Sequence, residues 1–204
     1  MPVSKHILVT EIDSEVGASV AKSLCNAGWQ VSGLGQKNAQ GSDYSCDLMN
    51  RDEVEKLVLR IEQEKGPLGG LVVASKFNSA SFLPFLEASP AQWQVRLDAW
   101  LKLATNIGNA VGKLMVQRKS GQIMILTPDF KAVNGDCIIE ATACGALHGF
   151  IKSFGAEVAA DKVCVNGLYA GLPFDLEAIN AMCSYLLEEG DYVSAQLISI
   201  AGKA

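Results

Sequence analysis

The chain has 204 residues, of which 49% are hydrophobic, so it is long enough for one sizeable core and too short for two ordinary domains. We therefore expect one domain over residues 1–204. The net charge of −5 and the 17 scattered Lys and Arg residues argue against a nucleic-acid surface. The absence of an apolar run of about 18 residues and of a secretory leader argues against a membrane span and predicts a cytoplasmic protein.

Short apolar runs alternate with amphipathic stretches along the chain. This alternation is typical of a parallel sheet with helices on both faces, so we predict an α/β, doubly wound, Rossmann-like fold. The predicted strands are residues 6–10, 30–34, 42–46, 70–74, 121–127, 163–168 and 195–200. The predicted helices are residues 15–27, 50–64, 90–117, 140–160 and 177–188.

Two connections are unusually short. Only the seven residues GQKNAQG separate the second and third predicted strands, which is too few for an ordinary helical crossover. Near the end of the chain, the last helix follows Gly171 almost at once. Doubly wound enzymes often carry a substrate lid in that region, because ligands bind beyond the carboxyl ends of the strands. We therefore expect a shortened second crossover and a missing lid.

Residues 6–17, HILVTEIDSEVG, have the pattern of a strand, a turn and a helix start of a dinucleotide site, but acidic residues replace the expected glycines. Such a turn needs glycines because the backbone closely approaches the pyrophosphate. Here it carries Glu11, Asp13 and Glu15, and only Gly17 remains. A carboxylate about 4 Å from a phosphate is repelled by roughly 4 kcal/mol at an effective dielectric constant near 20. The same carboxylates are expected to cap the helix instead.

The chain resembles the short-chain dehydrogenase/reductase family over nearly its whole length. The similarity is carried by ILVTEIDSEVGASVAKSL, CDLMNRDEVEKLV, QWQVRLDAWLKL, SGQIMILT, GALHGFIKSFGAEVA and VCVNGLYAG. The family turn Thr-Gly-x-x-x-Gly-x-Gly falls on residues 10–17, with Glu11 and Glu15 in place of two glycines. The family's ribose-binding acidic position holds Gly35, followed by Gln36. Asp47 matches an adenine-contacting aspartate, although an Asp before a helix is more often a cap. The resemblance therefore implies no nucleotide site in this chain.

The family reaction needs a tyrosine as acid or base, a lysine four residues later, and a serine that holds the substrate oxygen. In this chain the tyrosine and lysine positions align to Glu140 and Cys144. The serine position aligns to Pro128, beside Thr127, and the asparagine of the proton relay aligns to Trp100. The resemblance therefore predicts that the chain has no catalytic residues and no NAD of its own.

New chemistry could have replaced the old at Glu140, Cys144 and His148, which are spaced at i, i+4 and i+8 on one predicted helix. A Cys and a His one turn apart could act as nucleophile and base, or as two metal ligands. The surrounding residues are small and apolar, and no third ligand is evident. The six cysteines form no CxxC pair and are expected to be reduced thiols. We therefore predict no metal site and a packed helix surface.

The family features that this chain retains are those that build subunit contacts. In the family, the helices that match residues 90–117 and 140–160 pair across a two-fold axis. Helix 140–160 is rich in small residues, which permit close approach of another backbone. We therefore predict a noncatalytic subunit that pairs with a homologous, active, NAD-binding subunit in a heteromeric dehydrogenase, as a tetramer through these helices. The alternatives are a homo-oligomeric ligand-binding or regulatory protein, with Lys76 as an anion contact, and an enzyme that uses Glu140 and Cys144.

Overall fold

The computed structural model describes residues 4–36, 40–74, 85–129 and 137–202. Within these residues, six parallel strands form one sheet in the order β2-β1-β3-β4-β5-β6. The strands are β1 (His6–Thr10), β2 (Gln30–Leu34), β3 (Gly70–Val73), β4 (Gly121–Pro128), β5 (Val163–Ala170) and β6 (Leu197–Ile200). The predicted α/β doubly wound parallel sheet is therefore confirmed.

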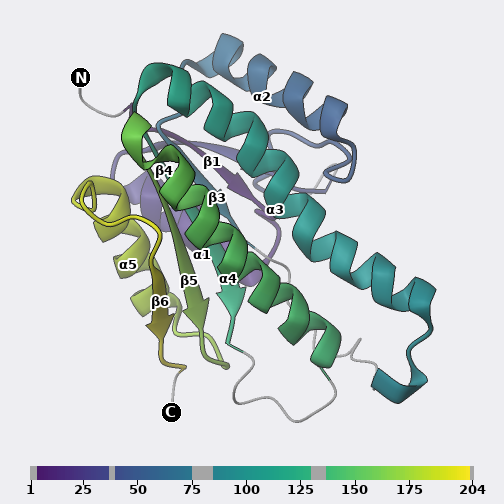
Figure 1. The fold of residues 1–204 in the computed structure, drawn as a ribbon. Coiled ribbons are helices and arrows are strands. Elements are labelled where there is room, and N and C mark those ends of the chain that lie inside the picture. The colour runs from purple at the N-terminus through teal and green to yellow at the C-terminus, as the bar shows by residue number, and fades with distance from the viewer. Residues whose placement is uncertain (1–3, 37–39, 75–84, 130–136, 203–204) are drawn as a thin grey trace.

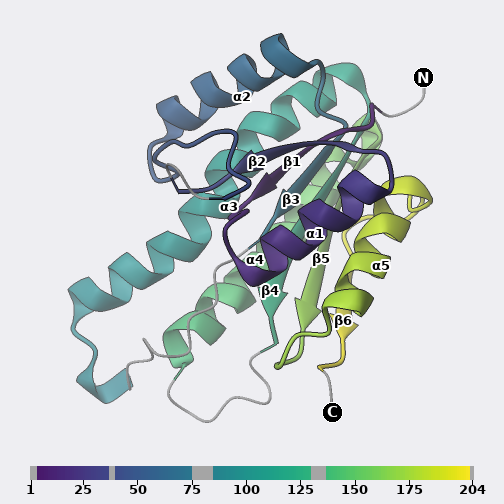
Figure 2. The same ribbon diagram turned by 180° about the vertical axis from the view of Figure 1, so that it is seen from behind.

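The helices cover both faces of the sheet (Figures 1 and 2). They are α1 (Glu15–Asn26), α2 (Arg51–Lys65), α3 (Pro90–Arg118), α4 (Ile138–Val158) and α5 (Leu176–Glu188), with the short 3-10 helices η2 (Phe85–Glu87) and η4 (Ala159–Asp161). One face carries α2, α3 and α4, and the other carries α1 and α5. No helix in the described part of the chain is long and apolar enough to cross a membrane.

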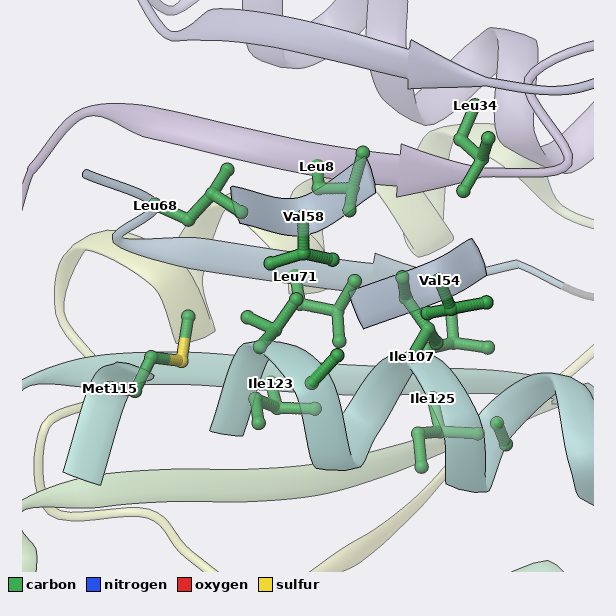
Figure 3. Close-up of a cluster of buried hydrophobic side chains, with 14 of the residues drawn as sticks. Leu8, Leu34, Val54, Val58, Leu68, Leu71, Ile107, Met115, Ile123 and Ile125 are labelled. Carbon is green, nitrogen blue, oxygen red and sulfur yellow. The ribbon is translucent and has the colours of Figure 1, made fainter. Parts of the chain in front are cut away.

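The core consists of two apolar clusters, one on each face of the sheet. Alternate side chains of a strand point to opposite faces, so Leu71 of β3 joins the α2–α4 cluster while its neighbour Val72 joins the α1–α5 cluster. Figure 3 shows the first cluster, in which Leu71 and Ile123 of the sheet lie against Val58 and Ile107 of the helices. Each such fully buried side chain stabilises the fold by about 1.5–3 kcal/mol.

The predicted strand at residues 42–46 is wrong. Tyr44 makes only an isolated parallel bridge to Leu34, and its amide donates to the carbonyl of Gly33 at 3.0 Å. The segment lies beside the end of β2 without extending the sheet, because the connection is too short for the crossover that parallel strands require. By contrast, the short connection between β5 and α5, residues 171–175, agrees with the expected lack of a lid there.

The prediction that carboxylates cap the first helix is wrong. The cap of α1 is Ser14. The Ser14 hydroxyl oxygen accepts a hydrogen bond from the amide of Gly17 at 3.0 Å. Glu15 lies exposed in the first turn, where its negative charge interacts favourably with the positive end of the helix dipole. A serine oxygen satisfies a free helix amide as well as a carboxylate does, so the acidic side chains remain outside the cap.

The turn between β1 and α1 keeps a glycine-type backbone without a glycine. Glu11 has φ of 49°, in the left-handed region that costs a non-glycine residue about 1–2 kcal/mol. A Cβ atom on Gly17 would lie 2.2 Å from the carbonyl oxygen of Glu11. Gly17 is therefore required by the close approach of α1 to the turn, whether or not a nucleotide binds.

Substitution of Gly17 by alanine should destabilise the protein. We expect Gly17→Ala to lower the free energy of unfolding by about 3 kcal/mol, because the new methyl group meets a backbone oxygen that cannot move alone. The matched control is Gly145→Ala, where no atom lies within 4 Å of the added Cβ. This control should gain about 1 kcal/mol from the higher helix propensity of alanine. Urea unfolding of both variants tests the account, and equal stabilities would contradict it.

Candidate functional site at the carboxyl edge of the sheet

The candidate site lies where the parallel strands end. The chain leaves β1 and β3 in opposite directions, and ligands of doubly wound folds bind at such a switch point. The Thr10 hydroxyl donates to the carbonyl of Ala74 at 3.2 Å and so ties the ends of β1 and β3 together. Glu11 follows β1, Gly35 follows β2 and Pro128 ends β4, so these predicted site positions share one edge of the sheet.

The position of Gly35 has no room for a side chain. A Cβ atom there would lie 2.9 Å from Cγ2 of Ile12 and 3.0 Å from Oδ1 of Asp13. Two side chains of the β1–α1 turn therefore occupy the space into which the family's acidic residue would extend from β2. A carboxylate still lies near this point, but it belongs to Asp13 and comes from the turn.

Asp47 stabilises a turn and does not cap α2. Its Oδ1 atom accepts a hydrogen bond from the amide of Met49 at 2.9 Å. The cap of α2 is Asn50, whose side-chain oxygen accepts from the amides of Asp52 and Glu53 at 3.1 and 3.3 Å. The expectation that Asp47 caps the helix is therefore wrong, because the cap is Asn50, three residues further along the chain.

An open cavity of about 410 Å³ lies beside these residues. Such a volume lies within the range of small-molecule sites. Burial, together with the carboxylates of Glu53 and Asp47, raises the pKa of the Cys46 thiol in its wall to about 11. The cavity is lined by acidic, small and apolar side chains, among them Glu11, Gly35, Asp47, Met49, Trp100 and Leu103. Trp100, at the family's asparagine position, thus forms part of an apolar wall.

The other end of the edge, between β4, β5 and the start of α1, is filled. The cavity there has a volume of only about 10 Å³, close to the least that a single water molecule needs. Phe174, from the β5–α5 connection, lines this space opposite Thr127 and packs against the apolar α1–α5 cluster. This cavity is too small for a flat ring, and Phe174 forms part of its wall.

Glu140 and Cys144 lie one turn apart on the buried face of α4, as the spacing predicts. Arg96 of α3 donates from Nη1 to Oε1 of Glu140 at 2.6 Å. The Glu140 side chain is only 8% exposed, and its Oε2 atom has no hydrogen-bond partner in the described structure. The tyrosine position of the family therefore holds one half of an ion pair between two helices.

Cys144 is not suited to act as a nucleophile. Burial raises the pKa of its thiol to about 12, and the Glu140 carboxylate contributes in the same direction. The reactive form of cysteine is the thiolate, which is scarce at neutral pH when the pKa is this high. His148 lies partly buried against Tyr169 of β5, with ring centroids 5.4 Å apart. Among the described residues, no group of three or more His, Cys, Asp and Glu side chains is placed to hold a metal ion.

The sequence analysis did not identify two residues of this region, Arg96 and Phe174. Arg96 could have been sought, because a glutamate in the apolar helix around residue 140 needs a cation nearby. Phe174 could have been suspected as a large apolar residue in a connection of only five residues. Neither partner could be assigned without the packing of α3 and of the β5–α5 connection. Lys76, the predicted anion contact, lies outside the described residues.

Known proteins with similar sequences include several that are named as reductases or dehydrogenases. Residues 5–173 match the short chain dehydrogenase family. An acetoacetyl-CoA reductase from Paracoccus denitrificans is 26% identical over 92% of this chain and 81% of its own length. Nodulation protein G from Azospirillum brasilense is 26% identical over 82% of this chain and 74% of its own. A 3-oxoacyl-[acyl-carrier-protein] reductase from Staphylococcus aureus is 26% identical over 84% and 75%.

The family match covers residues 5–173 and so extends through β5. The chain therefore belongs to the short chain dehydrogenase family.

Proposed function

We propose that this chain is a noncatalytic member of the family that pairs with a homologous, active subunit and stabilises it. The observation that carries the proposal is the Arg96–Glu140 ion pair, which stands where the family reaction needs a tyrosine. A carboxylate paired with a guanidinium holds two helices together but cannot replace a phenol activated by lysine. In this proposal, NAD is bound by the partner subunit and not by this chain.

The filled end of the cleft supports the same proposal. Phe174 packs where only about 10 Å³ is left beside Thr127. Pro128 has no hydroxyl with which to hold a substrate oxygen, and Cys144 has no charge with which to lower the pKa of a neighbouring acid. Acidic Glu11 and Glu15 in the turn oppose a pyrophosphate electrostatically.

The outer face of α4 is the proposed contact with the partner subunit. No atom lies within 4 Å of a Cβ built on Gly145 or Gly149, so this face presents a bare helix backbone to its surroundings. Glycine weakens a helix by about 1 kcal/mol relative to alanine, and close packing against another helix would offset that loss. We propose a hetero-oligomer, a tetramer, that forms through α3 and α4.

The substrate of the proposed complex is an acyl thioester. Two of the similar proteins are named as reductases of acetoacetyl-CoA and of a 3-oxoacyl carrier protein, both of which are thioesters. A heteromeric hydroxyacyl-CoA dehydrogenase would combine an active subunit of this kind with the present chain. The 2-[hydroxy(phenyl)methyl]succinyl-CoA dehydrogenase of anaerobic toluene degradation, with one active and one degenerate subunit, is the specific complex that we propose.

The α4 contact can be tested with alanine substitutions. Gly145→Ala/Gly149→Ala should stabilise the isolated chain by about 1 kcal/mol per site through helix propensity. The same change should weaken association with the partner subunit at least about 10-fold, because two added methyl groups overpack a close helix contact. Calorimetric titration measures the affinity, and Lys56→Ala on the exposed side of α2 is the control. Unchanged affinity of the glycine variant would remove the proposed interface.

The ion pair should behave as a structural element. Arg96→Met leaves the buried Glu140 carboxylate without its cation and should lower the free energy of unfolding by about 2 kcal/mol. This cost is smaller than for a fully buried pair, because a quarter of the Arg96 side chain is exposed. Arg96→Met/Glu140→Gln should recover part of the loss. Chemical unfolding of the single and double variants measures the coupling, and additive effects would argue against the pair.

Nucleotide binding separates the proposal from an active enzyme. The isolated chain should give no saturable NADH fluorescence signal up to millimolar concentrations, since the turn is acidic and Phe174 narrows the space beside Thr127. Phe174→Ala removes the filling side chain but leaves the turn, and it should also fail to bind. Micromolar NADH binding by the unmodified chain, with turnover of any alcohol or ketone, would exclude a noncatalytic role.

The open cavity of about 410 Å³ favours a second candidate function. In this alternative the chain is a homo-oligomeric binding protein that holds a ligand against Trp100, Leu103 and Met49, with no partner subunit. Thermal stabilisation of the isolated chain by a small molecule would support it. Loss of that stabilisation in Met49→Asp, which changes an exposed side chain of the lining, would place the ligand in this cavity.

A further inference from the structure

A second cavity lies at the opposite, amino edge of the sheet, far along the strands from the candidate site. It has a volume of about 620 Å³ and lies where α3 leads into β4, where η4 leads into β5, and beside the segment before β6. Its lining includes Lys119, Ser120, Lys162, Asp191, Tyr192 and Ser194. We refer to it as the amino-edge cavity.

Two lysines on this cavity occupy backbone positions that favour glycine. Lys119 ends α3 with φ of 53°, and Lys162 ends η4 with φ of 56°. Helices commonly end with glycine in this left-handed conformation, because a side chain there is disfavoured. Both side chains are exposed, and neither makes an ion pair or side-chain hydrogen bond within the described structure. Two independent helix ends therefore place an unpaired ammonium group on one cavity.

The other charges of the amino-edge cavity are already engaged. Arg118 makes two hydrogen bonds to the Glu62 carboxylate, at 2.9 and 2.8 Å, and a third to the carbonyl of Leu68 at 3.0 Å. Asp191 accepts from the side-chain amide of Gln122 at 3.1 Å. The amide of Gln122 is neutral, so Asp191 keeps its negative charge. The two positive charges of Lys119 and Lys162 outweigh it, although the whole chain has a net charge of −5.

The cavity also carries an exposed aromatic ring. Tyr192 is 97% exposed, far more than its ring would be if it contributed to the core. Cations beside the last carbonyls of α3 and η4 would offset the helix dipoles in any case. That role, however, needs neither a cavity of this size nor an aromatic side chain beside it. A ring that stacks on Tyr192 and an anion that meets the lysines would use all three features together.

We propose that the amino-edge cavity binds a small aromatic molecule that bears a phosphate or carboxylate group. The anion contacts Lys119 and Lys162, and the ring of the ligand stacks on Tyr192. A volume of about 620 Å³ accommodates a molecule of this class. The site is independent of the proposed noncatalytic role, since it lies at the edge of the sheet opposite to the family's cleft.

Titration of the ¹⁵N-labelled full chain with phenyl phosphate tests the site. Amide shifts should concentrate in residues 118–122, 162–164 and 191–194 and should saturate. Lys119→Gly/Lys162→Gly should weaken binding at least about 10-fold without lowering the melting temperature, because glycine is favoured at both backbone positions. Tyr192→Ser should weaken phenyl phosphate but leave inorganic phosphate unaffected.

The control is Lys56→Gln/Lys152→Gln, which removes the same total charge from exposed sites on α2 and α4. It should change the affinity less than twofold. Equal weakening by the control and the glycine variant would reduce the effect to net charge and overturn the proposal. Shifts that spread over the whole surface would also overturn the proposal. So would the absence of saturation at phenyl phosphate concentrations of roughly 20 mM, the weakest affinity of interest.

Discussion

The fold of this chain depends on the contact between the carbonyl oxygen of Glu11 and the backbone of Gly17. A Cβ at residue 17 would meet that oxygen at 2.2 Å, so the contact exists only because the residue is glycine. It sets how closely α1 follows β1, and Ser14 then caps the helix. Glu11 has a left-handed backbone in this turn, at a cost that packing of α1 against the sheet must offset. The turn therefore has a packing role in this chain.

At positions where the family has reactive or ligand-binding side chains, this chain has side chains that contact one another. Ile12 and Asp13 fill the space in front of Gly35, Phe174 fills the far end of the cleft, and Arg96 joins α3 to α4 through Glu140. These are contacts within the chain, although Oε2 of Glu140 has no hydrogen-bond partner in the described structure. Packed side chains and ion pairs add stability, whereas catalytic groups are usually strained or incompletely paired until substrate binds.

Much of the fold could be read from the sequence, because buried strands and amphipathic helices carry different periods. The ends of the six strands and five helices agree with the predicted ends within two residues. The false strand at residues 42–46 arose because an apolar alternation around Tyr44 does not show whether a neighbouring edge can be reached. The site was harder, since Arg96 and Phe174 act through contacts across the sequence, 44 residues apart in the case of Arg96 and Glu140. The local pattern of residues does not show which side chains distant in the sequence contact one another.

Native mass spectrometry of the protein isolated gently from its source organism tests the central claim most directly, because it reports partner chains and bound nucleotide together. The account predicts that the chain is found with a second, homologous subunit and that the complex carries one NAD per partner chain. A homo-oligomer of this chain alone, either free of nucleotide or with NAD bound to it, would contradict the account.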